Sequence, residues 1–104
     1  MQRMEYLNRY KQPHEVIIVL RKITGHSSRY NYKYLRMHLN YYKTMQEQKR
    51  IIRYGKILND DSVCVILKVS SNVDFENIIL NDPAINKLFE LVDAIPFNTT
   101  SLYE

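Results

Sequence analysis

Two runs of adjacent apolar residues stand out along the chain. One covers residues 16–20, and the other lies within Ser62–Val69. Both are short and rich in Val and Ile, which is typical of β-strands. Neighbouring side chains of a strand point to opposite faces, so an unbroken run predicts a strand buried on both faces. We also predict a last strand over Phe89–Phe97 and a short strand at Ile57-Leu58, before the turn residues 59–61.

Apolar residues at helical spacing predict two helices. From about Asn31 to Arg50 there is no Gly or Pro, and Gly55 is expected to end the segment. Its inner stripe is expected to hold Leu35, Leu39, Tyr42 and Met45, continued by Ile52. A second helix is predicted after the candidate N-caps Ser70-Ser71-Asn72, and Pro83 should end it. The inner stripe of this second helix should hold Phe75, Ile78, Ile79 and Asp82.

The predicted order is therefore strand, helix, strand, strand, helix, strand. In a chain of 104 residues, the βαββαβ order is typical of an α+β ferredoxin-like sandwich. Such a fold has a four-stranded antiparallel sheet with both helices on one face. We expect the domain to span residues 14–97, between an N-terminal extension, 1–13, and a polar C-terminal tail, 98–104.

Two helices cover only one sheet face, whereas the two long strands are apolar on both. An uncovered face of Val, Ile and Leu would be a larger apolar patch than soluble monomers usually tolerate. We therefore expect the open sheet face to be buried against that of a second copy, which gives a homodimer. Coverage by the N-terminal extension or the tail is the alternative.

Composition places the chain among soluble globular proteins. Hydrophobic residues are 45% and charged residues 25% of the chain, which argues against disorder. No apolar run approaches the ~20 residues of a membrane span, and the first residues lack the apolar block of a secretory signal. The only cysteine, Cys64, allows no internal disulfide and is expected to be inert core. These features fit a cytoplasmic location.

Charge is distributed unevenly along the chain. The first 58 residues hold 13 Lys and Arg against three acidic residues, while the remainder holds two against eight. A basic half can attract nucleic acid or a small anion. However, the predicted central strands, 16–20 and 63–67, carry none of the aromatic residues on which RNA-binding sandwiches stack bases. Nucleic acid is therefore the less favoured partner.

One histidine and one aspartate form the best candidate for chemistry. His38 lies on the inner face of the first predicted helix, and Asp82 at the end of the second. Antiparallel helices on one sheet face would bring the two together at one end of the sandwich. An aspartate bonded to one ring nitrogen fixes the tautomer and leaves the other nitrogen free to move protons. A core histidine and a helix-end aspartate without catalytic roles remain the alternative.

Other chemistry finds little support in the sequence. His14 and His26 are expected to be solvated, and no metal-binding spacing such as HxH or HExxH occurs. The only glycines are Gly25 and Gly55, so no glycine-rich phosphate loop is present and a nucleotide cofactor is not expected.

The stretch from His38 to Phe97 resembles the YciI-like (YCII-related) family of small dimeric α+β barrel proteins, and the similarity extends over about residues 14–97. The features that carry it are His38-Leu39 followed by Tyr42 and Met45, Gly55 before a turn, the apolar strand 63–69, Asn81-Asp82-Pro83 at a helix end, and Pro96-Phe97. Four positions depart from the family pattern: Leu35 replaces an arginine, Lys49 a glycine, Lys56 a proline and Leu88 a small residue.

The resemblance implies a homodimer and a pocket beside the His38 and Asp82 pair. Members of related families act by dehydrochlorination or isomerisation of small ring compounds, which implies a small anionic or aromatic ligand and no cofactor. We expect Tyr34 and Tyr42, one turn to either side of His38, to bind substrate. Arg36, or alternatively Lys33, is expected to replace the family's arginine.

Two functions remain open from the sequence. In the first, the chain is an enzyme of lyase or isomerase type, with His38 as general acid or base and Asp82 as its orienting partner. In the second, it is a non-catalytic dimeric module that binds a ligand or regulates a partner. A plain structural dimer with a vestigial pocket is a third possibility.

Overall fold

The computed structural model describes residues 11–98 of the chain. Residues 1–10 and 99–104, which include most of the expected extension and tail, lie outside the described part. The elements, in chain order, are β1 (His14–Lys22), α2 (Ser28–Glu47), β2 (Ile51–Lys56), β3 (Ser62–Val69), α3 (Asn72–Asn81) and β4 (Phe89–Phe97). This order confirms the predicted α+β chain of strands and helices.

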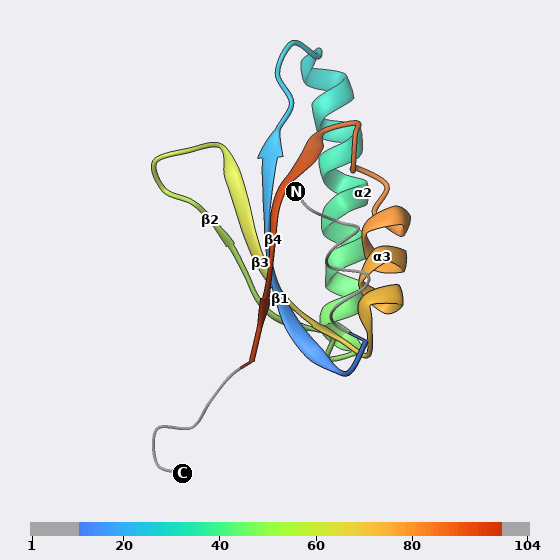
Figure 1. Cartoon of the computed structure of the whole chain (residues 1–104). Helices are drawn as coiled ribbons and strands as arrows, with labels where there is room; N and C mark the ends of the chain where they lie inside the picture. The colour runs from blue at the N-terminus through green and yellow to red at the C-terminus, as the bar shows by residue number, and fades with distance from the viewer. Residues whose placement is uncertain (1–10, 99–104) are drawn as a thin grey trace.

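The four described strands form one antiparallel sheet in the order β2-β3-β1-β4. Both helices lie on the same side of this sheet (Figure 1). The arrangement is compatible with the predicted ferredoxin-like fold. The long apolar strands β1 and β3 occupy the centre, and Ile17 of β1 lies opposite both Ile66 of β3 and Ile95 of β4.

The side of the sheet that faces the helices forms the core. Alternate residues of β1 point this way, and Val16, Ile18 and Leu20 are fully buried. Val65 and Leu67 of β3 are equally buried. Burial of each such side chain contributes roughly 1.5–3 kcal/mol to folding. The hydrophobic effect therefore fixes which face of the sheet turns inward.

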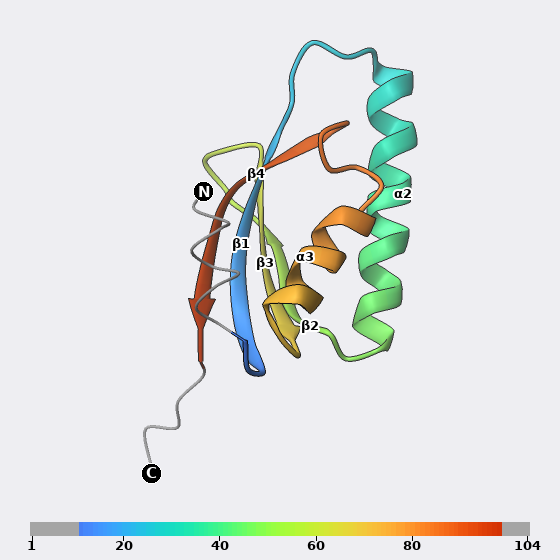
Figure 2. The same ribbon diagram turned by 45° about the vertical axis from the view of Figure 1, so that its right-hand side comes forward.

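Both helices pack their apolar side chains on this face. Phe75, Ile78 and Ile79 are the buried apolar residues of α3. The Tyr41 hydroxyl of α2 donates a hydrogen bond of 2.6 Å to the carbonyl of Ile78, so the two helices are also joined directly. Figure 2 shows both helices on the same side of the sheet, with the short α3 beside the lower part of α2. No helix in the described part of the chain is long and apolar enough to cross a bilayer.

The predicted ends of the first helix were partly wrong. The helix begins after Ser27, whose hydroxyl accepts the Tyr30 N–H, and ends at Glu47 rather than near Arg50. Lys49 adopts a left-handed conformation, with a φ of 60°, and turns the chain into β2. Helical periodicity continues past this point, but the turn ends the helix before it reaches the β-branched pair Ile51-Ile52.

The short strand was also misplaced. It covers Ile51–Lys56 and contains Gly55, whereas Ile57-Leu58 lies after its end. By contrast, the other three strands match their predicted positions. The Ser71 hydroxyl caps α3 by accepting the Asp74 N–H, and α3 ends immediately before Asp82-Pro83, as predicted.

The buried stripe of α2 differs from the predicted one. Leu35 and Leu39 are 39% and 45% exposed, whereas His38, Tyr42 and Met45 are buried. Both stripes contain Tyr42 and Met45 and keep three- and four-residue spacing, so periodicity alone could not exclude Leu35 and Leu39 from the inner face. The inner position predicted for His38 is confirmed, whereas that of Leu35 and Leu39 is wrong.

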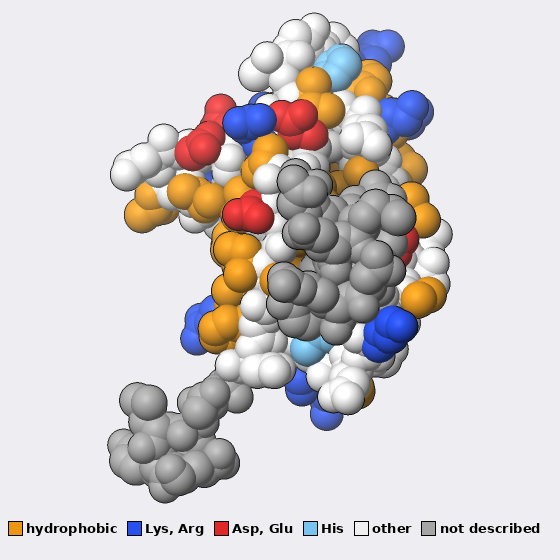
Figure 3. Space-filling model, in the orientation of Figure 1, with side chains coloured by type: hydrophobic (Ala, Val, Ile, Leu, Met, Phe, Trp, Pro, Cys, Tyr) orange, Lys and Arg blue, Asp and Glu red, His pale blue; other side chains and the backbone are white. Residues whose placement is uncertain are grey.

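The opposite side of the sheet, which we call the open face, carries apolar residues that no described helix covers. They are Ile17 and Val19 of β1, Cys64 and Ile66 of β3, and Ile95 and Phe97 of β4. Ile95 and Phe97 are more than 40% exposed. Cys64, expected in the core, instead lies half-buried on this face. Hydrophobic side chains gather along the side of the molecule away from the helices (Figure 3).

The left-handed residue after α2 gives a test of the fold. A non-glycine residue in this conformation costs roughly 1–2 kcal/mol. Glycine removes this strain, but it loses more conformational entropy on folding, which offsets about 0.5–1 kcal/mol of the stabilisation. Lys49→Gly should therefore raise the free energy of unfolding by about 0.5–1 kcal/mol, measured by urea denaturation. Lys43→Gly, inside α2, is the control and should lower it by about 1 kcal/mol. A loss of stability in both variants would contradict the assigned backbone conformation.

Candidate active site

The site begins with a histidine that α2 places inside the core. His38 has no exposed surface, and its ring packs against those of Tyr42 and Phe89 at centroid distances of 4.6 and 4.7 Å. Tyr42 lies one helical turn after His38, and Phe89 begins β4. A buried imidazole must find partners for both ring nitrogens, because an unsatisfied buried polar group costs about 1–3 kcal/mol.

Asp82 supplies the first partner from the end of α3. The proline at position 83 keeps Asp82 out of the helical conformation, and its backbone is extended, with φ −70° and ψ 116°. One carboxylate oxygen accepts the Ala84 N–H at 2.9 Å, which fixes the side chain over the following turn. The same carboxylate faces His38, with Nδ1 at 3.1 Å from Oδ2 and 3.3 Å from Oδ1. The predicted meeting of these two residues is therefore confirmed.

This contact determines which nitrogen of the neutral ring carries hydrogen. A carboxylate can only accept, so Nδ1 of His38 is the donor. The Nε2 atom is then free to accept a hydrogen bond or a proton. Both side chains are fully shielded from water. An electrostatic contact is stronger in such surroundings than at the surface, and breaking it by removing one partner is costly.

Tyr54 supplies the second partner from β2. Its hydroxyl lies 2.8 Å from Nε2 of His38 and donates to it when Nδ1 carries the ring hydrogen. Burial, with the nearby Asp82 carboxylate as the smaller cause, raises the pKa of Tyr54 to about 12. The hydroxyl therefore keeps its proton at neutral pH. Together, the three side chains form a continuous hydrogen-bonded series, the Asp82–His38–Tyr54 chain.

A bulge in β2 turns Tyr54 toward the site. Ile51 pairs with Leu67 and Tyr54 pairs with Val65, both on the helix-facing side of the sheet. Residues three apart on a regular strand point to opposite faces. The register shift between Ile51 and Arg53 inserts one extra residue and returns Tyr54 to the inner side.

The expected substrate-binding residues lie at different distances from this chain of hydrogen bonds. Tyr42 is buried against the His38 ring, and burial raises the pKa of its hydroxyl well above the ordinary value. Tyr34 is half-buried one turn earlier and packs against Tyr30. Arg36 is exposed, and it lies two residues from His38, on another side of the helix. The structure thus brings Tyr42, but not Arg36, to the His38 and Asp82 pair.

A hollow of about 290 Å³ opens beside Tyr54, and we call it the Tyr54 pocket. It lies at the end of the sheet where β1 and β2 finish and β3 and β4 begin. Its lining residues are Lys22, Asn31, Leu35, Tyr54, Lys56, Asp61, Val63, Leu88 and Phe89. Since Tyr54 and Phe89 both contact His38, the pocket is separated from the buried imidazole by one layer of side chains.

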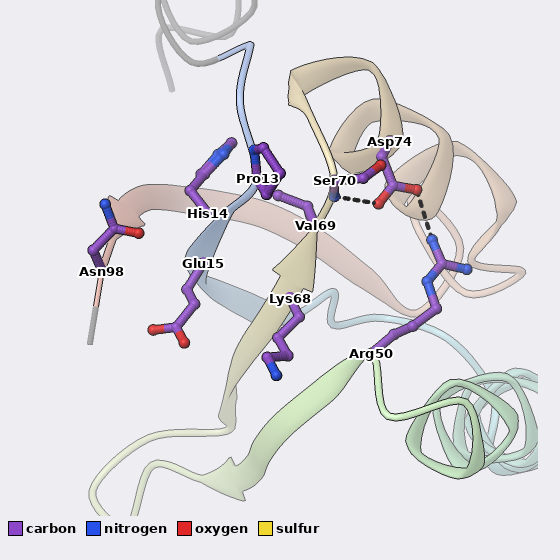
Figure 4. A pocket seen from close by; sticks show the side chains of 9 residues that line it. All are labelled: Pro13, His14, Glu15, Arg50, Lys68, Val69, Ser70, Asp74 and Asn98. Atoms are coloured by element: carbon purple, nitrogen blue, oxygen red, sulfur yellow. Dashed lines mark hydrogen bonds and ion pairs between the residues drawn. The ribbon is translucent and has the colours of Figure 1, made fainter. Parts of the chain in front are cut away.

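A larger and more open hollow, of about 730 Å³, lies at the opposite end of the sheet (Figure 4). Its most prominent charged pair is Arg50 and Asp74, joined at 2.7 Å. The second oxygen of Asp74 accepts the Ser70 N–H at 2.8 Å. Because these groups satisfy one another and join the residue before β2 to the start of α3, we assign them a structural role.

Among residues 11–98, no three His, Cys, Asp or Glu side chains gather in a way that could hold a metal ion. His26 is exposed and stacks on Tyr30, with ring centroids 4.1 Å apart. His14 lies at the start of β1, where its Nδ1 is 2.6 Å from the carbonyl oxygen of Gln12. The three histidines are thus distributed over separate parts of the fold.

Comparison with known proteins identifies no family model that matches this chain, and no curated protein matches it in sequence.

Tyr54 is the site residue that the sequence did not reveal. The segment before Gly55 was assigned to the end of the first helix, so Tyr54 was not expected on a strand. The β-branched pair Ile51-Ile52 followed by Arg53-Tyr54 was the available signal for a strand. Even so, regular alternation would have predicted that Ile51 and Tyr54 point to opposite faces of the sheet, whereas the bulge puts both on the same face.

The tautomer of His38 can be tested by Asp82→Asn. If the amide oxygen of the new side chain takes over the Ala84 N–H, its NH2 group faces Nδ1, which must then accept. The ring hydrogen should move to Nε2 and donate to the Tyr54 hydroxyl. We expect 15N NMR of the imidazole to show an Nδ1–H ring in the native protein and an Nε2–H ring in the variant. The signals of His14 and His26 serve as internal controls. An Nε2–H ring in the native protein would contradict the assigned donor.

Proposed function

We propose that this chain is a YciI-like, cofactor-independent enzyme of lyase or isomerase type that moves a proton on a small molecule. The observation that carries the proposal is the buried His38 imidazole, held between the Asp82 carboxylate and the Tyr54 hydroxyl. The resemblance over residues 14–97 supports it, since the family's His and Asp positions coincide with the two residues that meet in the fold.

The chemistry follows from the two ends of the imidazole. When Nε2 takes up a proton, the ring becomes positive, and the carboxylate beside Nδ1 stabilises that charge. Asp82 also holds the ring in one orientation, so little reorganisation accompanies the transfer. Such positioned acid–base catalysis contributes about 10²–10⁴-fold in rate. Isomerisation needs only that a proton leave one atom of the substrate and return to another.

A second candidate is a non-catalytic ligand-binding module. The favouring observation is that His38 is fully buried and both of its nitrogens are bonded. A satisfied buried network also stabilises a core without any chemistry. The two candidates differ in whether a bound small molecule exchanges protons with the protein.

The enzymatic proposal can be tested by proton exchange. Small keto acids with an acidic C–H bond, namely pyruvate, levulinate and 4-hydroxyphenylpyruvate, would be incubated with the protein in D2O and followed by NMR. We expect enzyme-dependent exchange in at least one of them. His38→Gln should slow it about 100-fold or more, because the ring that accepts the proton is lost. Equal exchange in the variant, or none in the native protein, would favour the ligand-binding module.

The homodimer is part of the same proposal. The open face exposes Ile95 and Phe97 beside Ile17 and Ile66, and a second copy would offer the same apolar surface in return. Packing of two sheets face to face would remove these side chains from water. It would also produce the dimeric α+β barrel that the family resemblance implies.

Analytical ultracentrifugation can test the dimer. The native protein should sediment at about twice the chain mass of 12.5 kDa. Ile95→Lys places a charge on the open face and should shift the population to the monomer, since a buried unpaired charge is costly. Leu80→Lys is the matched control, because Leu80 is 66% exposed on α3, away from the sheet. A native monomer, or equal dissociation in both variants, would contradict this interface.

A further inference from the structure

The hydrogen-bonded chain reaches the surface at only one of its three members. His38 has no exposed surface and Asp82 is 4% exposed, whereas Tyr54 is 37% exposed. Tyr54 also lines the Tyr54 pocket, and neither His38 nor Asp82 does. Nε2 of His38 is covered by the Tyr54 hydroxyl at 2.8 Å. A molecule bound in the pocket would therefore meet Tyr54 rather than His38.

The charges at the rim of the Tyr54 pocket favour an anion. Lys22 is the last residue of β1 and Lys56 the last residue of β2, and both strands end at this side of the sheet. The one acidic side chain that lines the pocket is Asp61. Two ammonium groups against one carboxylate leave a net positive rim, which attracts a small carboxylate.

The inner wall of the pocket favours an apolar body with a hydrogen-bond donor. Leu88 and Phe89 are buried apolar side chains that form part of the wall. The carbonyl oxygen of the Asn31 side chain is buried and has no hydrogen-bond partner among the described residues. A buried oxygen without a partner is costly, and rotation of the Asn31 side chain toward the pocket would let a ligand hydroxyl pair with it. A volume of about 290 Å³ limits the ligand to a small molecule.

We propose that Tyr54 is the catalytic residue that passes the proton between His38 and a small hydroxylated carboxylate bound in the Tyr54 pocket. This inference rests on the function proposed above. As the substrate C–H bond breaks, its proton goes to the Tyr54 oxygen while the Tyr54 proton goes to Nε2 of His38. In the return step, Nε2 gives its proton back to the Tyr54 oxygen, and the Tyr54 hydroxyl proton goes to another atom of the substrate. No oxidant or cofactor is needed.

A neighbouring hollow provides a control for the location. Besides the Tyr54 pocket, Tyr54 borders another hollow, of about 340 Å³, which is also lined by Lys43 of α2. That hollow has one lysine rather than two, and its wall beside His38 is formed by Tyr42 instead of Phe89. Lys43 and Lys56 are both exposed, so replacing either with glutamine removes one charge at a comparable cost to the fold.

The binding arm of the test uses 4-hydroxybenzoate, which has one carboxylate, one hydroxyl and an apolar ring. In NMR titrations, its dissociation constant should rise about three- to tenfold in Lys22→Gln and in Lys56→Gln, and stay within twofold in Lys43→Gln. Amide shifts should gather at residues 22, 31, 56 and 89. Equal loss in all three variants, or no binding to the native protein, would overturn the assignment of the pocket.

The catalytic arm uses Tyr54→Phe, which keeps the ring and removes only the hydroxyl. Proton exchange should fall about 100-fold or more. The double variant with His38→Gln should be no slower than the slower single variant, as expected for residues that act as a unit. Tyr32→Phe is the matched control, because Tyr32 is 67% exposed on α2, and it should exchange at the native rate. The 15N signal of His38 Nε2 should also shift in Tyr54→Phe but not in Tyr32→Phe.

The outcomes separate this inference from the function on which it rests. Exchange that is lost in His38→Gln but kept in Tyr54→Phe would overturn the role of Tyr54 and leave the enzymatic function standing. Absence of exchange in the native protein would overturn both. An unchanged Nε2 signal in Tyr54→Phe would show that the hydroxyl does not bond to His38, and would overturn the relay by itself.

Discussion

The site depends on the requirement that a fully buried imidazole satisfy both of its nitrogens. His38 is held by a carboxylate on one side and a hydroxyl on the other, and these come from α3 and β2. The consecutive elements α2 and β2 are therefore linked at one ring to the end of α3, which lies much later in the chain. Because each unmade bond would cost about 1–3 kcal/mol, the packing of both helices on the sheet is coupled to the geometry of the site.

The two sides of the sheet serve different purposes. The side that faces the helices is closed by Val16, Ile18 and Leu20 of β1 and their neighbours, and it supports the buried hydrogen-bonded chain. The open face keeps Ile95 and Phe97 more than 40% exposed. The proposed dimer would bury this second side and so stiffen the strands that carry Tyr54 and Lys22. Assembly and chemistry would then depend on the same central strands.

Local backbone features determine where the polar groups point. Pro83 keeps Asp82 out of the helix, and the Ala84 N–H then anchors its carboxylate toward α2. The bulge after Ile51 turns Tyr54 to the inner side. The left-handed Lys49 ends α2 early enough for β2 to begin at Ile51. Each of these three irregularities involves a single residue. Together they place Asp82 and Tyr54 against one buried ring.

Local sequence patterns were sufficient for most of the elements and for the pairing of His38 with Asp82. Runs of Val and Ile defined β1 and β3, proline defined the end of α3, and antiparallel helices implied that these two residues would meet. The inner position of Leu35 and Leu39, the end of α2 and the place of β2 were wrong. Periodicity specifies the spacing of a stripe but not its rotation, and it does not register a bulge. Only the tertiary structure decided that Tyr54 joins the site. The side of the sheet to which its side chain points depends on the pairing of β2 with β3, and its hydroxyl is held by the second nitrogen of His38.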